Sequence, residues 1–205
     1  MKTRLLYIVL AMYLCVIGCT PETRVVDTRN DQGKAVIVLD YRDFAETASE
    51  MVQSMIASGA LNKPGGGRYV MTTGKIQNDT MQRIDTDQLM AKIEEDLLNS
   101  GRVVMTAAVG GKGAPDQMVY DTRDIRDSEV GTEFDPNTLP GKGQLLMPEL
   151  STSGKIIQKV LTYSKNEQQV EYYFQLRVTN LANGLVLWQK EDLIVKRGSK
   201  KTVAW

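Results

Sequence analysis

The stretch that decides the fold is Val-Glu-Tyr-Tyr-Phe-Gln-Leu-Arg-Val-Thr, residues 170–179. Apolar side chains stand at Val170, Tyr172, Phe174, Leu176 and Val178, and polar or tyrosine side chains separate them. This period of two is typical of a β-strand with one buried face. The stretch therefore predicts a strand that turns five apolar side chains toward a core and makes a sheet the centre of the fold.

The flanking sequence predicts partners for this strand on both sides. Residues 156–164 precede it across the polar turn 165–167, and residues 185–195 follow it across Asn183-Gly184. Short polar turns of this kind join antiparallel neighbours. We expect a three-stranded antiparallel meander, with Val186 and Trp188 of the last strand pointing inward.

Two amphipathic helices are predicted upstream. Residues 43–58 open on Asp43, read as an N-cap with Glu46 three residues on, and close before Gly59; residues 86–99 open behind Asp85 and close before Gly101. Each carries an apolar stripe at helical spacing, which favours core packing over a groove for a partner. The stripes are Phe44, Ala48, Met51, Val52, Met55 and Ile56, and Leu89, Met90, Ile93 and Leu97.

The second helix is flanked by two expected strands, residues 68–77 and 102–109, and a short strand is expected at 35–39. Strand, helix and strand in this order indicate a parallel pair. The fold class is therefore a single α/β domain at the border with α+β: a mixed sheet, a C-terminal antiparallel meander and helices packed on it. The predicted core includes Phe44, Met51, Ile93, Leu97, Phe174, Leu176 and Trp188.

The N-terminal residues have the pattern of a targeting signal. Lys2 and Arg4 precede thirteen apolar residues, 5–17, which end in Gly18-Cys19. A charged start followed by an apolar run too short to span a membrane comfortably is typical of a secretory signal, although an N-terminal anchor or a buried helix has the same composition. We expect a signal peptide at 1–18, a tether at 19–34 and a periplasmic domain at 35–205.

Composition argues against several classes of function. The 205 residues include 25 basic and 25 acidic side chains, so no net charge draws the chain to nucleic acid, and no histidine is present for a triad or a metal site. No motif pairs a hydroxyl with an activating base. The glycine loops at 110–113 and 141–143 lack the spacing of a phosphate loop. We expect no catalytic residues, no metal and no cofactor.

Three segments stand out by their charge or their irregular sequence. Asp121, Asp124, Asp127 and Glu129 alternate with arginines and are expected to form a solvated helical face, within a possible helix at 116–128. Residues 110–143 are long and irregular, so we expect them to provide a contact surface for a partner. Lys196, Arg197, Lys200 and Lys201 are expected to form a solvated tail beyond the last strand.

Several blocks carry a family resemblance. Val16-Ile17-Gly18-Cys19 resembles a bacterial lipobox. The helix with Phe44 and Met51-Val52, the strand ending at 78–80, the helix ending at 99–102 and the block 176–188 resemble the penicillin-binding protein activator LpoB family from about Tyr41 to Val195. The resemblance implies a lipoprotein acylated at Cys19, with Thr20 directing it to the outer membrane, and direct stimulation of a bifunctional peptidoglycan synthase.

The resemblance has one gap and one alternative. It fails between residues 110 and 143, and the tether is short, reaching at most about 50 Å when fully extended. The layout also resembles, more distantly, the periplasmic part of the curli secretion lipoprotein CsgG and the N-terminal domain of TolB. An envelope scaffold or secretion accessory, without synthase activation, is the alternative function.

Overall fold

The computed structural model describes residues 36–110 and 116–202, and the expected signal peptide and the whole of the expected tether lie outside them. The domain is built from one sheet and two helices, with a further helix and a 3-10 turn between the second and third strands. In chain order these are α2 (Tyr41–Ala57), β1 (Tyr69–Asp79), α3 (Thr86–Asn99), β2 (Val103–Met105), α4 (Met118–Arg126), η1 (Glu129–Glu133), β3 (Leu150–Thr162), β4 (Glu167–Asn180) and β5 (Val186–Ser199).

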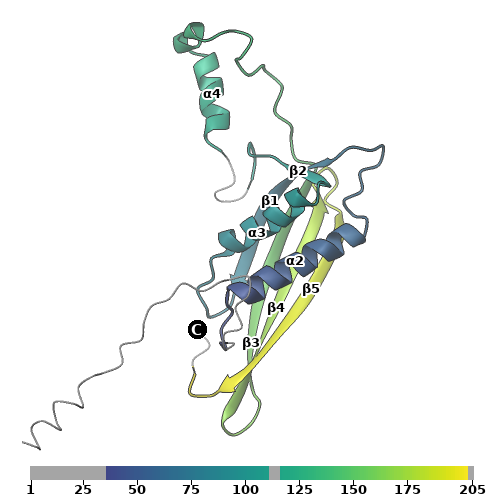
Figure 1. Ribbon diagram of the computed structural model, residues 1–205, viewed down its shortest axis with the longest axis vertical. Helices are drawn as coiled ribbons and strands as arrows, with labels where there is room; N and C mark the ends of the chain where they lie inside the picture. The colour runs from purple at the N-terminus through teal and green to yellow at the C-terminus, as the bar shows by residue number, and fades with distance from the viewer. Residues whose placement is uncertain (1–35, 111–115, 203–205) are drawn as a thin grey trace, which may run out of the picture. The chain divides into compact units, whose positions relative to one another are not determined.

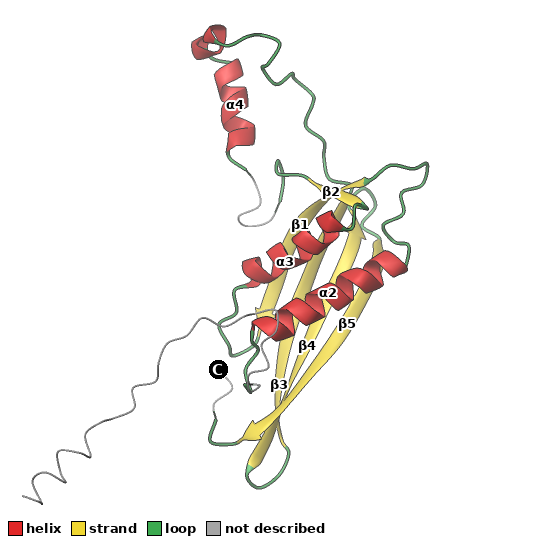
Figure 2. Cartoon of the chain, viewed as in Figure 1, coloured by secondary structure: helices red, strands yellow, loops and turns green. Residues whose placement is uncertain are grey.

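The sheet is mixed. Its strand order is β2-β1-β3-β4-β5; β1 pairs in parallel with β2 and β3, and β3, β4 and β5 are antiparallel. Figure 1 labels the strands and colours them by their place along the chain, and Figure 2 shows α2 and α3 side by side across one face of the sheet. The predicted fold class, the parallel pair and the C-terminal meander are confirmed.

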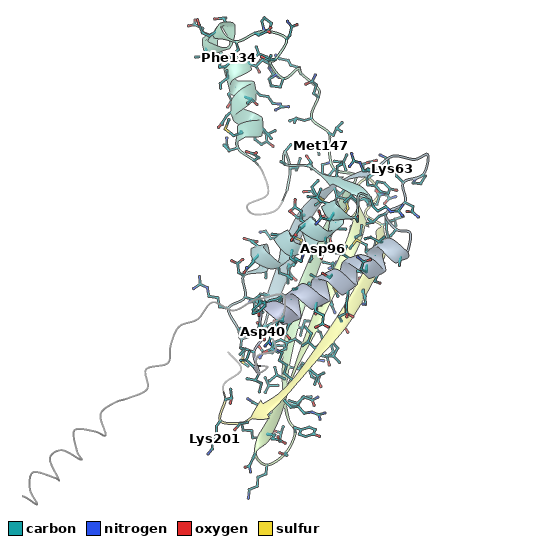
Figure 3. The ribbon with its side chains drawn as sticks, viewed as in Figure 1. Asp40, Lys63, Asp96, Phe134, Met147 and Lys201 are labelled. Carbon is teal, nitrogen blue, oxygen red and sulfur yellow. The ribbon has the colours of Figure 1, made fainter. Side chains whose placement is uncertain are left out.

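The core lies between the sheet and the two helices. The five alternating apolar residues of β4 are all buried there, together with the stripes of α2 and α3. The predicted core residues are confirmed apart from Phe44, which is only half-buried and packs against the edge of the core. On α3, Asp96, which is labelled in Figure 3, accepts a hydrogen bond from a residue of α2 and so joins the two helices. The donor is the Ser49 hydroxyl, at 2.8 Å.

The start of α2 differs from the prediction. The N-cap is Asp40, three residues before the expected cap, and its carboxylate accepts from the backbone N–H groups of Arg42 and Asp43. The Asp43 carboxylate in turn accepts a hydrogen bond from the backbone N–H of Asp40 at 2.7 Å, and the two interactions together form a capping box. The Asp-x-x-acid pattern occurs twice, at 40–43 and 43–46, and the structure uses the first.

Two expected strands are wrong or too long. Residues 36–40 form no strand, because the side-chain amide of Gln82 bonds both the N–H and the carbonyl of Leu39, at 3.1 and 3.0 Å, where a strand neighbour would stand. The strand expected at 102–109 ends at Met105. Beyond it the chain turns, and the Thr106 hydroxyl accepts a hydrogen bond from the backbone N–H of Ala108.

The last strand corrects two further expectations. A register shift between Val178 and Thr179 pairs Val178 with Trp188 but Thr179 with Val186. Trp188 is therefore buried as expected, whereas Val186 is 48% exposed. Because β5 continues to Ser199, Lys196 belongs to the strand and not to a solvated tail. Its side chain, 10% exposed, contacts the carboxylate of Asp43.

Candidate protein-binding surface

The side of the sheet opposite α2 and α3, called here the outer face, carries ordered rows of exposed side chains. Cross-strand register aligns three rows on it, running from β3 through β4 to β5. The first row holds Ile157, Tyr173 and Leu193, the second Lys159, Glu171 and Val195, and the third Leu161, Gln169 and Arg197. Aromatic, aliphatic and charged side chains thus alternate on a rigid support.

Hydrogen bonds hold these side chains in place. The Tyr173 hydroxyl and the Gln169 amide both donate to the Glu171 carboxylate at 2.7 Å. The Lys159 ammonium lies 4.6 Å from the centre of the Tyr173 ring, a cation–π distance. Because the exposed side chains are already ordered, a partner would lose little of their conformational entropy on binding.

The charge of Glu171 is maintained by its neighbours. Hydrogen bonds from Tyr173 and from Gln169 lower the pKa of the Glu171 carboxyl, and the charge of Lys159 acts in the same direction. The bond to Glu171 in turn raises the pKa of Tyr173. Near neutral pH the pair is therefore a carboxylate and a neutral phenol, which presents a fixed negative charge within a largely basic surface.

One end of the outer face is basic. The guanidinium of Arg197 lies 4.0 Å from the Tyr163 ring and donates to the Tyr163 hydroxyl at 3.1 Å and to Gln169 at 2.8 Å. Four exposed lysines surround it on the β3–β4 hairpin and past the end of β5. These are Lys159, Lys165, Lys200 and Lys201, and with Arg197 they define the basic end (Lys201 is labelled in Figure 3).

A groove on the opposite side of the domain lies between the first turns of α2 and α3. It encloses about 310 Å³, and its lining includes Tyr41, Phe44, Ile84 and Leu89. Phe44 is half-buried because it forms part of this groove rather than the centre of the core. The groove is thus a second concave, mainly apolar surface on the domain.

The residues singled out in the sequence do not converge on one site. Cys19 lies outside the described residues. Asp121, Asp124, Asp127 and Glu129 lie on or just after α4, where Asp127 pairs with Arg126 at 2.6 Å and Lys142 at 3.5 Å. Within residues 36–110 and 116–202, no cluster of acidic or thiol side chains is arranged to hold a metal ion.

Two further observations bear on the chemistry. The backbone N–H of Gly141, in one of the two glycine loops, donates to the side chain of Gln144 at 2.9 Å and is therefore already satisfied. Over the described part of the chain, none of the helices combines the length and apolar character that crossing a bilayer requires.

The outer face is the feature that sequence reasoning missed. Its apolar members, Leu161, Leu193 and Val195, are 45–52% exposed, although their sequence neighbourhood is typical of strand interiors. Only the cross-strand register brings them beside Tyr173 and Arg197. The residues of β4 that alternate with the buried ones include a tyrosine and an arginine, residue types enriched at protein interfaces. This composition was the one sign of a binding surface in the sequence.

The chain belongs to the LpoB family. The family model described as peptidoglycan-synthase activator LpoB matches residues 43–194, a range that holds nearly all of α2, the whole of α3 and the sheet from β1 into β5. The family assigned from the sequence resemblance is confirmed, and the family is one of regulatory activators. No curated protein sequence matches the chain.

The solved structures that the chain matches include three of LpoB, from Salmonella enterica and Escherichia coli. The C-terminal domain of LpoB from Salmonella enterica is 11% identical, with 74% of this chain and 98% of that chain covered and a TM-score of 0.40. The same domain from Escherichia coli is 11% identical, with the same coverage and a TM-score of 0.41. The NMR structure of E. coli LpoB is 13% identical, covers 89% of this chain and 82% of that chain, and has a TM-score of 0.41.

Proposed function

We propose that this protein is an outer-membrane lipoprotein, anchored through Cys19, that binds a bifunctional peptidoglycan synthase of the penicillin-binding class and stimulates it. The observation that carries the proposal is the family match over residues 43–194. The lipobox at 16–19 supports the anchor. The protein itself catalyses nothing and takes no cofactor; it acts by contact.

Anchoring explains how a binding surface of modest affinity could keep a synthase bound. A lipid anchor and a tether of residues 20–34 confine the domain to a thin layer beneath the membrane, which raises its local concentration there. Binding in the micromolar range would then keep a nearby synthase occupied. The short tether restricts the encounter to a synthase that extends toward the outer membrane.

The test is a rate measurement on the purified synthase. Chain lacking residues 1–19 should raise the rates of glycan polymerisation or crosslinking, with a dose dependence that saturates in the micromolar range. The matched control is Leu176→Asp, which places a charge in the core where Leu176 is fully buried and so removes the folded surface at nearly constant composition. Circular dichroism verifies that the control is unfolded.

One result of this measurement would contradict the activator function. If the folded chain neither binds the synthase nor changes either rate at concentrations far above micromolar, the activator function is wrong for this protein. The alternative of an envelope scaffold or secretion accessory would then take its place.

A further inference from the structure

The segment between β2 and β3 carries an exposed apolar surface that lies outside the hydrophobic core. Residues 116–147, called here the arm, hold α4 and η1, and the only buried residue in the arm is Gly131. Five of its apolar side chains are 48–72% exposed, and Figure 3 labels two of them, Phe134 and Met147. The five are Met118, Val130, Phe134, Leu146 and Met147.

The arm has little to stabilise it alone. The hydrophobic core cluster contains no residue between 106 and 147 among those that the structure describes. An isolated helix of nine residues, the length of α4, is marginal in water, and most helical stability in proteins comes from packing of an apolar face. A surface that covers the exposed apolar side chains would therefore stabilise the arm.

The arm is also strongly acidic. It contains seven acidic and three basic residues. Arg126 and Lys142 both pair with Asp127. The other six acids, Asp116, Asp121, Asp124, Glu129, Glu133 and Asp135, have no basic side chain within 4.0 Å in the described part of the chain. The surface that covers the arm should therefore be basic as well as apolar.

The basic end of the outer face has the complementary composition. Its five cations form no ion pair with any described carboxylate. Beside them lie four apolar or aromatic side chains that are 45–52% exposed: Leu161, Tyr163, Leu193 and Val195. Opposite charge and exposed apolar area on both sides are what a specific protein contact needs.

The topology separates these two surfaces within one chain. The arm joins the sheet just before Leu150, the first residue of β3, whereas the basic end begins near the other end of that strand. The thirteen residues of β3 span about 40 Å at about 3.3 Å per residue.

We infer that the arm of one copy docks on the basic end of the outer face of a second copy. The contact is head to tail, because the two surfaces differ and lie at opposite ends of the sheet. Contacts of this type repeat from copy to copy and give a ring where the rotation closes and an open row where it does not. The inference stands independently of synthase activation.

The test is a zero-length carbodiimide crosslink between carboxylates and amines. Full-length chain in a non-ionic detergent, prepared as an equal mixture of ¹⁵N-labelled and unlabelled protein, should form multimers whose size rises with concentration. Mass spectrometry should find arm carboxylates joined to Lys159, Lys165, Lys200 or Lys201, with labelled and unlabelled peptides in the same product. Products that join only like-labelled peptides would mean that the arm folds onto its own chain, which overturns the inference.

Charge reversal gives a second readout. Asp124→Lys with Glu133→Lys in the arm, or Lys165→Glu with Lys201→Glu at the basic end, should each abolish the multimers. Mixing the two reversed proteins should restore them, because each then offers a surface that fits the other. Glu46→Lys with Glu50→Lys on the exposed side of α2 is the matched control and should change nothing. A monomer at every concentration, or no restoration on mixing, would contradict the inference.

Discussion

Lys196 shows how a single residue joins distant parts of the chain. Its ammonium donates to the carbonyl of Val38 at 2.9 Å, contacts the carboxylate of Asp43 and lies 3.8 Å from that of Asp40. The last strand thereby fixes both the entry of the chain and the first turn of α2. A side chain that appeared to be part of a solvated tail is a cross-link between the two ends of the domain.

We predict that Lys196→Met lowers the free energy of unfolding by about 2 kcal/mol, because hydrogen bonds to charged groups are worth about 1.5–3 kcal/mol and Asp43 loses its cation. Methionine keeps most of the volume of the lysine stem, so packing changes little. Urea unfolding at pH 7 measures the loss. Lys200→Met, at an exposed position, is the control and should be neutral; equal stability of the two variants would contradict the role assigned to Lys196.

The carboxylate of Asp40 is expected to make the stability of the domain fall at acidic pH. Burial acts to raise its pKa, but hydrogen bonds from the Arg42 guanidinium and from the backbone N–H groups of Asp43 and Arg42, together with the charge of Lys196, leave the pKa lowered. A carboxyl with a lowered pKa stabilises the fold above its unfolded value of about 3.8. That contribution is lost as the pH falls through the folded pKa.

Asp40→Asn isolates this contribution, because asparagine is an equally good N-cap but carries no charge. We expect the variant to be less stable than the parent at pH 7 and the difference to shrink below about pH 4. Denaturant unfolding at pH 7 and pH 3 measures both values. Asp87→Asn, in the exposed first turn of α3, is the control. A stability difference that stays constant with pH would show that the charge of Asp40 is not what matters.

At the scale of elements, the join between β1, β3 and β4 depends on a glycine. The pairing of β1 with β3 shifts register between Thr73 and Ile76, and Gly154 of β3 pairs with Ile76 at the shift. A Cβ at Gly154 would lie 2.5 Å from the carbonyl oxygen of Gln175 on β4. Since that oxygen belongs to the backbone, β3 and β4 could accommodate a side chain only by moving apart.

We predict that Gly154→Ala costs about 1–3 kcal/mol of stability, the range for inserting a methyl group into a packed site. Thermal unfolding followed by circular dichroism measures it. Ser153→Ala, one residue earlier with its side chain on the outer face, is the matched control and should change the melting midpoint little. An unchanged midpoint for Gly154→Ala would mean that the strands at this point are less closely packed than described.

At the scale of the whole molecule, the proposed lipid anchor at Cys19 sets the membrane at which the domain would act. We predict that Cys19→Ala releases the protein from membranes or leaves it uncleaved, because a lipoprotein signal is processed only at an acylated cysteine. Fractionation of the envelope and mass spectrometry of the N-terminal peptide measure the outcome. An unmodified Cys19 in parent protein isolated from membranes would contradict the prediction. Thr20→Ala, outside the cysteine itself, serves as the processing control.

Local pattern alone determined most of the elements. The bounds of α3 agree with its cap and apolar stripe, and the alternation at 170–179 located β4 with the correct buried face. Helix periodicity and strand alternation are properties of neighbouring residues, so they are visible in a single chain. The family match over 43–194 includes both of these elements.

The tertiary structure decided what depends on register and distant partners. Val186 points outward because the pairing shifts by one residue at Val178, and in a strand such a shift exchanges the two faces. The Lys196 side chain is only 10% exposed because Asp43, 153 residues earlier, lies beside it. The outer face and its basic end arise in the same way, since cross-strand neighbours far apart in sequence become adjacent only when the sheet forms.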